Sequence, residues 1–248
     1  MKHLLRLVFA FAFAGSAFAG DTVITKQKHS DAGMGQPAKD TTEVTWIGQG
    51  HMRIEDATAI TIVRADLKKM YMLDPAAKTC TTVDLPFDMK KYMPPEMAAH
   101  MDQMFASSKA TLTPTTETKK VKDWNATKYT LAVTLPMGGS VTQEMWVTKD
   151  VGGDRSGWQE MFSAQNALGP FAASMAAELK KLDGLPLLTE TTTVMMGATM
   201  KSSESVTSIE EKDAPAGHYD VPSGYTEKPF DPMAGMGMGG PGGRPRKN

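Results

Sequence analysis

The chain has 248 residues, 41% of them hydrophobic, and its 27 basic side chains nearly balance its 28 acidic ones. This apolar content is enough to form a core in one large β-rich domain or two small ones. The near-neutral, mixed charge argues against a nucleic-acid partner, which requires a clustered basic face.

The first nineteen residues have the three-part pattern of a secretory signal peptide. The stretch opens with basic side chains within residues 1–6, continues with an almost wholly apolar run over residues 4–14, and ends in small residues at Ala17 and Ala19. We therefore expect cleavage after Ala19 and export to the periplasm or the exterior. Cys80 is the only cysteine, so an internal disulfide is excluded, and its strand-like surroundings predict that the thiol is buried.

Residues 21–84 alternate between apolar and polar side chains, as half-buried strands do. The polar Glu43 and Thr45, for example, alternate with the apolar Val44 and Trp46 along the chain. Short connections such as residues 74–78, which contain a proline suited to a turn, make consecutive strands antiparallel neighbours. This third of the chain is predicted to be a meander.

The period changes to that of a helix after Pro94-Pro95-Glu96. A proline is tolerated in the first helical turn, and the following apolar side chains recur at i, i+4, i+7 and i+8. They are Met97, Met101, Met104 and Phe105. The spacing predicts an amphipathic helix with one apolar stripe.

Strands resume at Thr111, with turns predicted at residues 122–125 and 137–140. A second helical region follows, in which Trp158 and Phe162 share one face, and then Phe171, Met175, Leu179 and Leu182 share another. Gly184 and Pro186 end it. Residues 187–194 and 199–210 then read as an antiparallel pair, and residues 231–248, rich in Gly, Pro and Met, as a disordered tail.

These elements amount to nine to eleven strands broken by two helical inserts. A long antiparallel sheet of that size tends to curl, and the helices must then cover its concave, apolar side. The predicted fold class is α+β, mainly β: a curled antiparallel sheet, or unclosed β-barrel, with a helical lid. The predicted organisation is a signal peptide over residues 1–19, one domain over residues 20–230 and the tail.

Several short sequence segments, in their order along the chain, resemble the LolA/LolB-like (lipoprotein-carrier) superfamily, in particular an uncharacterised branch of secreted domains of unknown function. They are residues 62–74 (IVRADLKKMYMLD), 123–129 (DWNATKY), 144–148 (EMWVT), 184–186 (GLP) and 219–225 (YDVPSGY). The resemblance implies an unclosed β-barrel with a helical lid over an apolar cavity, which known relatives use to carry acyl chains across the periplasm. No binding residue is carried over, because no motif here matches the carriers' functional positions.

The candidate ligand-binding residues therefore come from the two apolar stripes. They are Met97, Met101, Met104 and Phe105 of the first helix, with Trp158, Phe162, Phe171 and Met175 of the second region. The expected ligand is a lipid or an acyl chain, bound by a monomer that makes transient contact with the membrane or with envelope proteins. The same side chains could instead fill the core of a structural domain with no ligand.

Copper handling is a second alternative, because the chain has 20 methionines. Met97, His100 and Met104 lie within two helical turns and offer the thioether and imidazole donors that suit Cu(I). Catalytic motifs are missing from the sequence: it has no Gly-x-Ser-x-Gly elbow, no His-Glu-x-x-His pair and no phosphate-binding glycine loop. We therefore expect a binding protein without a resident cofactor rather than an enzyme.

Overall fold

The computed structural model describes residues 20–33, 37–151, 172–195 and 197–231. Within them, twelve strands form one continuous sheet. The strands are β1 (Asp21–Ser30), β2 (Lys39–Gly48), β3 (His51–Glu55), β4 (Ile60–Arg64), β5 (Lys69–Asp74), β6 (Thr79–Asp84), β7 (Lys109–Val121), β8 (Trp124–Thr134), β9 (Ser140–Thr148), β10 (Leu185–Met195), β11 (Ala198–Lys212) and β12 (Thr226–Lys228). Two α-helices, α1 (Pro95–Phe105) and α3 (Ala172–Leu179), and two short 3-10 helices, η1 (Met89–Tyr92) and η2 (Pro136–Gly138), complete the described elements.

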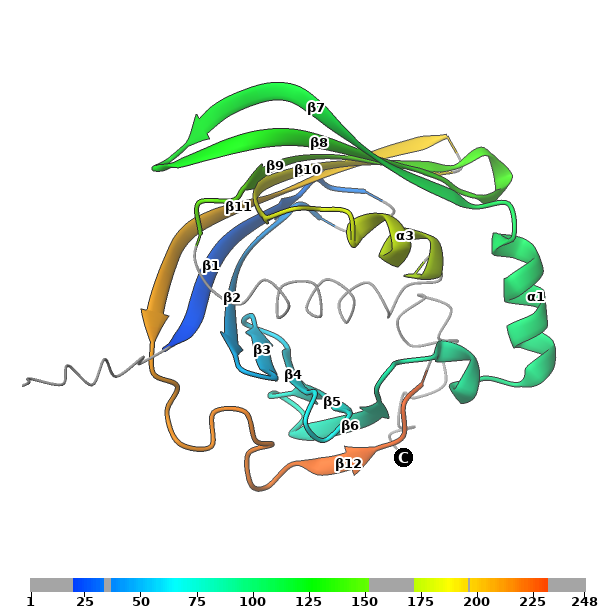
Figure 1. Ribbon diagram of the computed structural model, residues 1–248. Helices are drawn as coiled ribbons and strands as arrows, with labels where there is room; N and C mark the ends of the chain where they lie inside the picture. Colours follow the sequence, from blue (N-terminus) through cyan, green and yellow to red (C-terminus); the bar gives the residue numbers. More distant parts are fainter. Residues whose placement is uncertain (1–19, 34–36, 152–171, 196, 232–248) are drawn as a thin grey trace, which may run out of the picture.

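The sheet is built from two antiparallel meanders, β1–β6 and β7–β11, which are joined where β1 pairs with β11. The strand order is β12-β6-β5-β4-β3-β2-β1-β11-β10-β9-β8-β7, and only the pairing of β12 with β6 is parallel. The ribbon curls into a barrel that stays open between its two ends (Figure 1). The predicted fold class, a curled antiparallel sheet with helical inserts, is confirmed.

Helix α1 carries the chain across this opening. The segment leaves β6 near one end of the sheet, passes through η1 and α1, and enters β7, which is the edge strand at the other end (Figure 1). Pro95 occupies the first turn, where its missing N–H leaves no hydrogen bond unmade. The helix predicted after Pro94 is confirmed.

Helix α3 lies inside the curve of the sheet (Figure 1). Its buried Leu179, and Leu182 in the turn that follows, pack against strands β7–β9, so the side chains that they meet face the concave side. The predicted apolar stripe continues to Leu182, but the α-helix ends at Leu179, and the Leu182 N–H donates to the Leu179 carbonyl in a final turn.

The convex face is covered in part by the chain segment that follows β11. Buried Ile62, Leu73 and Cys80 on β4–β6 pack against Tyr219 and Tyr225 of that segment. Cys80 is only 5% exposed, which confirms the predicted burial. Burial raises the pKa of its thiol, so the side chain behaves as a small apolar group.

Strand β12 accounts for the difference between the twelve observed strands and the nine to eleven expected. Its three residues are all exposed and carry no apolar alternation, so they give no strand signal. The predicted first part of the second helical region and nearly all of the predicted tail lie outside the described residues.

Candidate functional site

The concave face over β7–β10 is an apolar wall. On β8, Tyr129, Leu131 and Val133 are buried and alternate with more exposed residues, so all three point to the concave side. They belong to a cluster that also contains Leu112, Leu135, Met145, Val147, Leu179 and Leu182. Sheet and helix therefore bury their apolar sides against each other.

Helix α3 is also fixed to the edge of the sheet by a hydrogen bond. The backbone N–H of Leu112 on β7 donates to Oε2 of Glu178 over 2.9 Å. The hydrogen bond that the Lys181 ammonium donates to Glu178 is the largest cause that lowers the pKa of this carboxyl group, and the bond from Leu112 comes next. The Glu178 carboxylate thus pairs with a backbone N–H that the edge strand β7 would otherwise leave unpaired.

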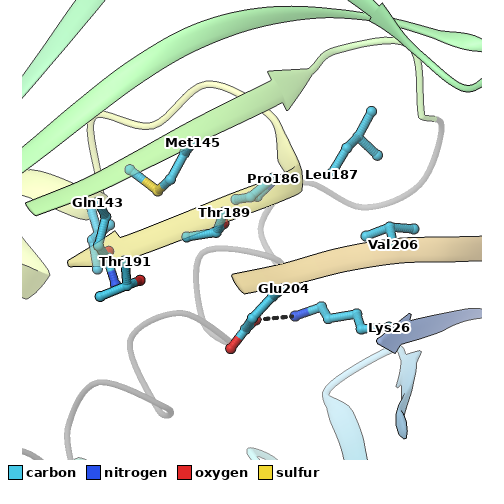
Figure 2. A pocket seen from close by; sticks show the side chains of 10 residues that line it. Lys26, Gln143, Met145, Pro186, Leu187, Thr189, Thr191, Glu204 and Val206 are labelled. Carbon is cyan, nitrogen blue, oxygen red and sulfur yellow. Dashed lines mark ion pairs between the residues drawn. The ribbon is translucent and has the colours of Figure 1, made fainter. Parts of the chain in front are cut away.

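A cavity of about 140 Å³ lies on this concave side. Five apolar residues and five polar residues line it: Met145, Leu179, Pro186, Leu187 and Val206 on one hand, and Lys26, Gln143, Thr189, Thr191 and Glu204 on the other. Figure 2 shows the labelled side chains approaching one another from β1, β9, β10 and β11. The cavity is therefore amphipathic rather than wholly apolar.

Two of its polar residues, Lys26 and Glu204, belong to an ion cluster on the concave face, the inner ion cluster, which also contains Lys28 and Glu43. The strand register places Lys26 opposite Glu43, and Lys28 opposite Glu204. Lys28 is in direct contact with both carboxylates, at 2.9 Å from Glu43 and 3.2 Å from Glu204. Lys26 lies farther from them, at 3.7 Å from Glu43 and 3.8 Å from Glu204.

The charges of this cluster oppose the effect of burial. Burial alone would lower the pKa of Lys28, but the carboxylates of Glu204 and Glu43 outweigh it and hold the pKa above its ordinary 10.5. Two buried oxygen atoms on the same face, Glu43 Oε1 and Thr45 Oγ1, have no hydrogen-bond partner among the described residues. A buried polar atom without a hydrogen-bond partner lowers the stability of the fold.

The structure separates the residues that the sequence proposed for binding. Met175 on α3 is half-buried and packs against the apolar wall. On α1, Met97 is 37% exposed and Met101 and Phe105 are half-buried. The side chain of Met104 and all of Trp158, Phe162 and Phe171 lie outside the described residues, so their role stays a prediction.

The copper candidates do not form an enclosed site in the part of the chain that is described. Met97 and His100 are both exposed on α1. Among the described residues, no three His, Cys, Asp or Glu side chains are arranged to hold a metal ion. Neither described helix is long and apolar enough to cross a bilayer.

Sequence reasoning missed the inner ion cluster, although a signal was present. Lys26 and Lys28 lie two and four positions after the buried Ile24, so an ordinary strand places all three side chains on the same face. Lysine at such positions is unusual, because charged side chains are rarely buried unless paired. Their partners Glu43 and Glu204 come from other strands and could not be identified from local spacing.

A family model for a domain of unknown function, DUF4412, matches residues 33–225. The chain belongs to this family. A comparison with curated proteins finds no match.

Solved structures with similar arrangements include PNGF-II, at 15% identity and a TM-score of 0.41, over 89% of this chain and 32% of that one. The chain thus spans about a third of that protein. A LolA superfamily protein from Nitrosomonas europaea has 7% identity and a TM-score of 0.31, over 81% of this chain and 90% of its own. A putative outer membrane lipoprotein-sorting protein domain from Vibrio parahaemolyticus has 9% identity and a TM-score of 0.33, over 81% and 89%.

Proposed function

We propose that this DUF4412 protein is an exported binding or carrier protein for an apolar or amphiphilic ligand such as an acyl chain, and that it catalyses no reaction. The observation that carries the proposal is the cavity between α3 and the concave face, where Leu179, Leu187 and Val206 provide an apolar surface. Each methylene group that such a surface buries contributes about 0.8 kcal/mol.

The size of the cavity bears on what it holds. Its 140 Å³ is close to the engineered apolar cavity of about 150 Å³ that accepts benzene, and below the roughly 300–1,000 Å³ of most ligand pockets. It accommodates one end of an amphiphile as it stands. A complete acyl chain requires α3 to move away from the wall, and we propose that Met175, together with the predicted stripe residues Met97, Met101, Met104, Phe105, Trp158, Phe162 and Phe171, contacts that chain.

The proposal is tested by titrating the exported chain with N-phenyl-1-naphthylamine, a neutral probe that fluoresces in apolar sites. Leu179→Gln places an amide in the cavity wall, and its neighbour Lys180→Gln changes an exposed side chain in the same turn. We expect Leu179→Gln to weaken binding about ten-fold, because burying a leucine contributes about 1.5–3 kcal/mol. Lys180→Gln should bind like the unmodified protein.

Circular dichroism of both variants at the assay temperature controls for unfolding, because Leu179 also contributes to the core. Equal binding by the two folded variants would contradict a site at this wall. Native mass spectrometry of gently purified protein provides an independent measurement, since a carrier of acyl chains should retain lipid. In that spectrum, bound copper and no lipid would favour the copper alternative instead.

A further inference from the structure

We infer that Lys26 anchors the polar end of the ligand and that this end is uncharged and bears a hydroxyl group. The inference rests on the proposed function and specifies which amphiphile the cavity takes. Lys26 lines the cavity on β1, opposite Val206 of β11, so a polar contact and an apolar contact are available to the same molecule (Figure 2).

Most of the Lys26 side chain is buried, and its ammonium group makes no hydrogen bond to a described residue. Its side chain is only 10% exposed, and the nearest carboxylate oxygens, at 3.7 and 3.8 Å, are beyond ordinary hydrogen-bond distance. A lysine ammonium has three N–H donors, and buried donors require acceptors. Among the described residues, Lys26 therefore has charge partners but no acceptor, and the cavity is where an acceptor can reach it.

Lys28 provides the contrast within the same cluster. Its side chain is 33% exposed and contacts Glu43 and Glu204 at 2.9 and 3.2 Å. The more accessible lysine thus makes the close ion pairs, while the more deeply buried one keeps its donors free. This division is the opposite of what stability alone favours, because the deeply buried charge needs close partners most.

The charge of the cluster argues for a neutral ligand. Two lysines face two glutamates, so the four formal charges already cancel. A carboxylate or phosphate bound to Lys26 would bring a third negative group beside Glu43 and Glu204 in a poorly hydrated place, where like charges repel strongly.

The carboxylate of Glu204, which lines the cavity beside Lys26, selects a hydroxyl among neutral groups. Its Oε2 lies 3.8 Å from the Lys26 ammonium. A hydroxyl group that contacts both residues accepts from Lys26 with its oxygen and donates its hydrogen to Glu204. An ester carbonyl satisfies only the lysine, and a carboxylate cannot donate at all.

The apolar part of the ligand then lies along the adjoining wall. Leu187 of β10 and Leu179 of α3 line the cavity together with Val206. The inferred ligand is an amphiphile of the monoacylglycerol or long-chain alcohol type, with its hydroxyl end at Lys26.

The test is isothermal titration calorimetry of the exported chain with 1-monolauroylglycerol and with dodecanoate, which share the same chain length, below their aggregation concentrations. Three variants are compared. Lys26→Met keeps the length of the side chain and removes its donors, Lys26→Gln keeps an amide donor, and Lys201→Met makes the same replacement on the convex face, since Lys201 lies at an odd offset from Val206 along β11.

We expect the unmodified protein to bind 1-monolauroylglycerol about ten-fold or more tightly than dodecanoate. Lys26→Met should lose about ten-fold or more in affinity for the glyceride, as expected when a hydrogen bond from a charged donor is removed. Its affinity for N-phenyl-1-naphthylamine, which has no hydroxyl, should stay the same. Lys201→Met should bind both probes normally.

Two results would overturn the inference. If Lys26→Met and Lys26→Gln, both folded by circular dichroism, bind the glyceride like the unmodified protein, Lys26 is not the anchor. If dodecanoate binds more tightly, the polar end is anionic instead. In either case, binding of the apolar probe leaves the proposed function standing. Failure of the unmodified protein to bind any of the three probes would instead remove the proposed function itself.

Discussion

His218 lies on the convex face of the sheet, where its ring packs against two aromatic side chains. The ring centroid is 4.5 Å from that of Trp46 on β2 and 5.2 Å from that of Tyr219. Tyr219 also stacks on His51 of β3, and its hydroxyl donates to Asp21 Oδ2 over 2.6 Å. The segment that follows β11 is thereby attached to the outside of β1–β3.

The protonation of His218 opposes this packing. Its Nε2 is buried without a partner among the described residues. Burial, followed by the charge of Arg53, lowers the pKa of His218 below the ordinary 6.5, while Glu55 and Asp21 act weakly in the other direction. Arg53 also donates from Nη1 to the His218 carbonyl oxygen over 3.1 Å. The neutral ring is therefore the form that the folded state accepts.

We predict that His218 makes the fold less stable in mild acid. A group whose pKa is lower in the folded state stabilises fully above its unfolded pKa, and this stabilisation is lost as the pH falls through the folded value. The free energy of unfolding, measured by urea titration between about pH 7.5 and 5, should therefore fall more steeply for the unmodified protein than for His218→Phe.

His218→Phe keeps an aromatic ring on Trp46 and cannot titrate, so the difference between the two curves isolates this group. His29 does not affect this comparison. Hydrogen bonds with Asp40 and Asp31 raise its pKa, and its contribution to the free energy of unfolding is present in both proteins. Parallel curves over the whole range would show that His218 does not control the acid response.

At the scale of elements, the connection between α3 and β10 depends on one glycine. Gly184 has a φ of +140°, in the region that side chains disfavour. A Cβ atom there would lie only 2.2 Å from the carbonyl oxygen of Thr148 on β9. Leu185, the next residue, pairs with Thr148, so the close approach is part of how β10 joins the sheet.

We predict that Gly184→Ala destabilises the protein by about 3 kcal/mol or more, since positive φ and a clash with backbone act together. Gly197→Ala is the matched control: its φ is +79°, but a Cβ would meet nothing within 4 Å. That change should cost about 1 kcal/mol, from the backbone alone. Urea unfolding of both variants measures the difference, and equal costs would mean that β9 and β10 separate without penalty.

At the scale of the whole molecule, the sheet forms most of a ring whose two ends are bridged by η1 and α1 (Figure 1). The concave face thus carries contributions from strands at both ends of the chain. Lys26, Leu187 and Val206 around the cavity come from β1, β10 and β11, which meet where the two meanders join. A ligand in the cavity contacts the folded arrangement only.

Ligand binding is therefore expected to stabilise the entire fold. If the proposed function holds, 1-monolauroylglycerol at about a hundred times its dissociation constant should add about 2.7 kcal/mol to the free energy of unfolding. The measurement is a thermal melt with and without the glyceride, with Lys26→Met as the control that should shift less at the same concentration. An unchanged or lowered melting temperature would indicate binding to the unfolded chain or none at all.

Most of the local structure could be predicted from the sequence alone. Alternation of apolar and polar side chains located eleven of the twelve strands, and Pro94-Pro95 marked the start of α1 within one residue. Alternation works because each strand buries one face, and helical spacing works because a stripe must pack. The isolated, strand-embedded Cys80 was correctly predicted to be buried.

Which faces meet could not be predicted from local patterns and follows from the packing of the folded chain. Period-two alternation says that Lys26 shares a face with Ile24, but it does not say that Glu43 and Glu204 lie beside it, or that the face is concave. The pairing of β1 with β11 and the docking of His218 on Trp46 likewise join distant parts of the chain. Such contacts are selected by the packing of the whole sheet, because many strands offer equivalent local patterns and the choice between them depends on how all the strands pack together.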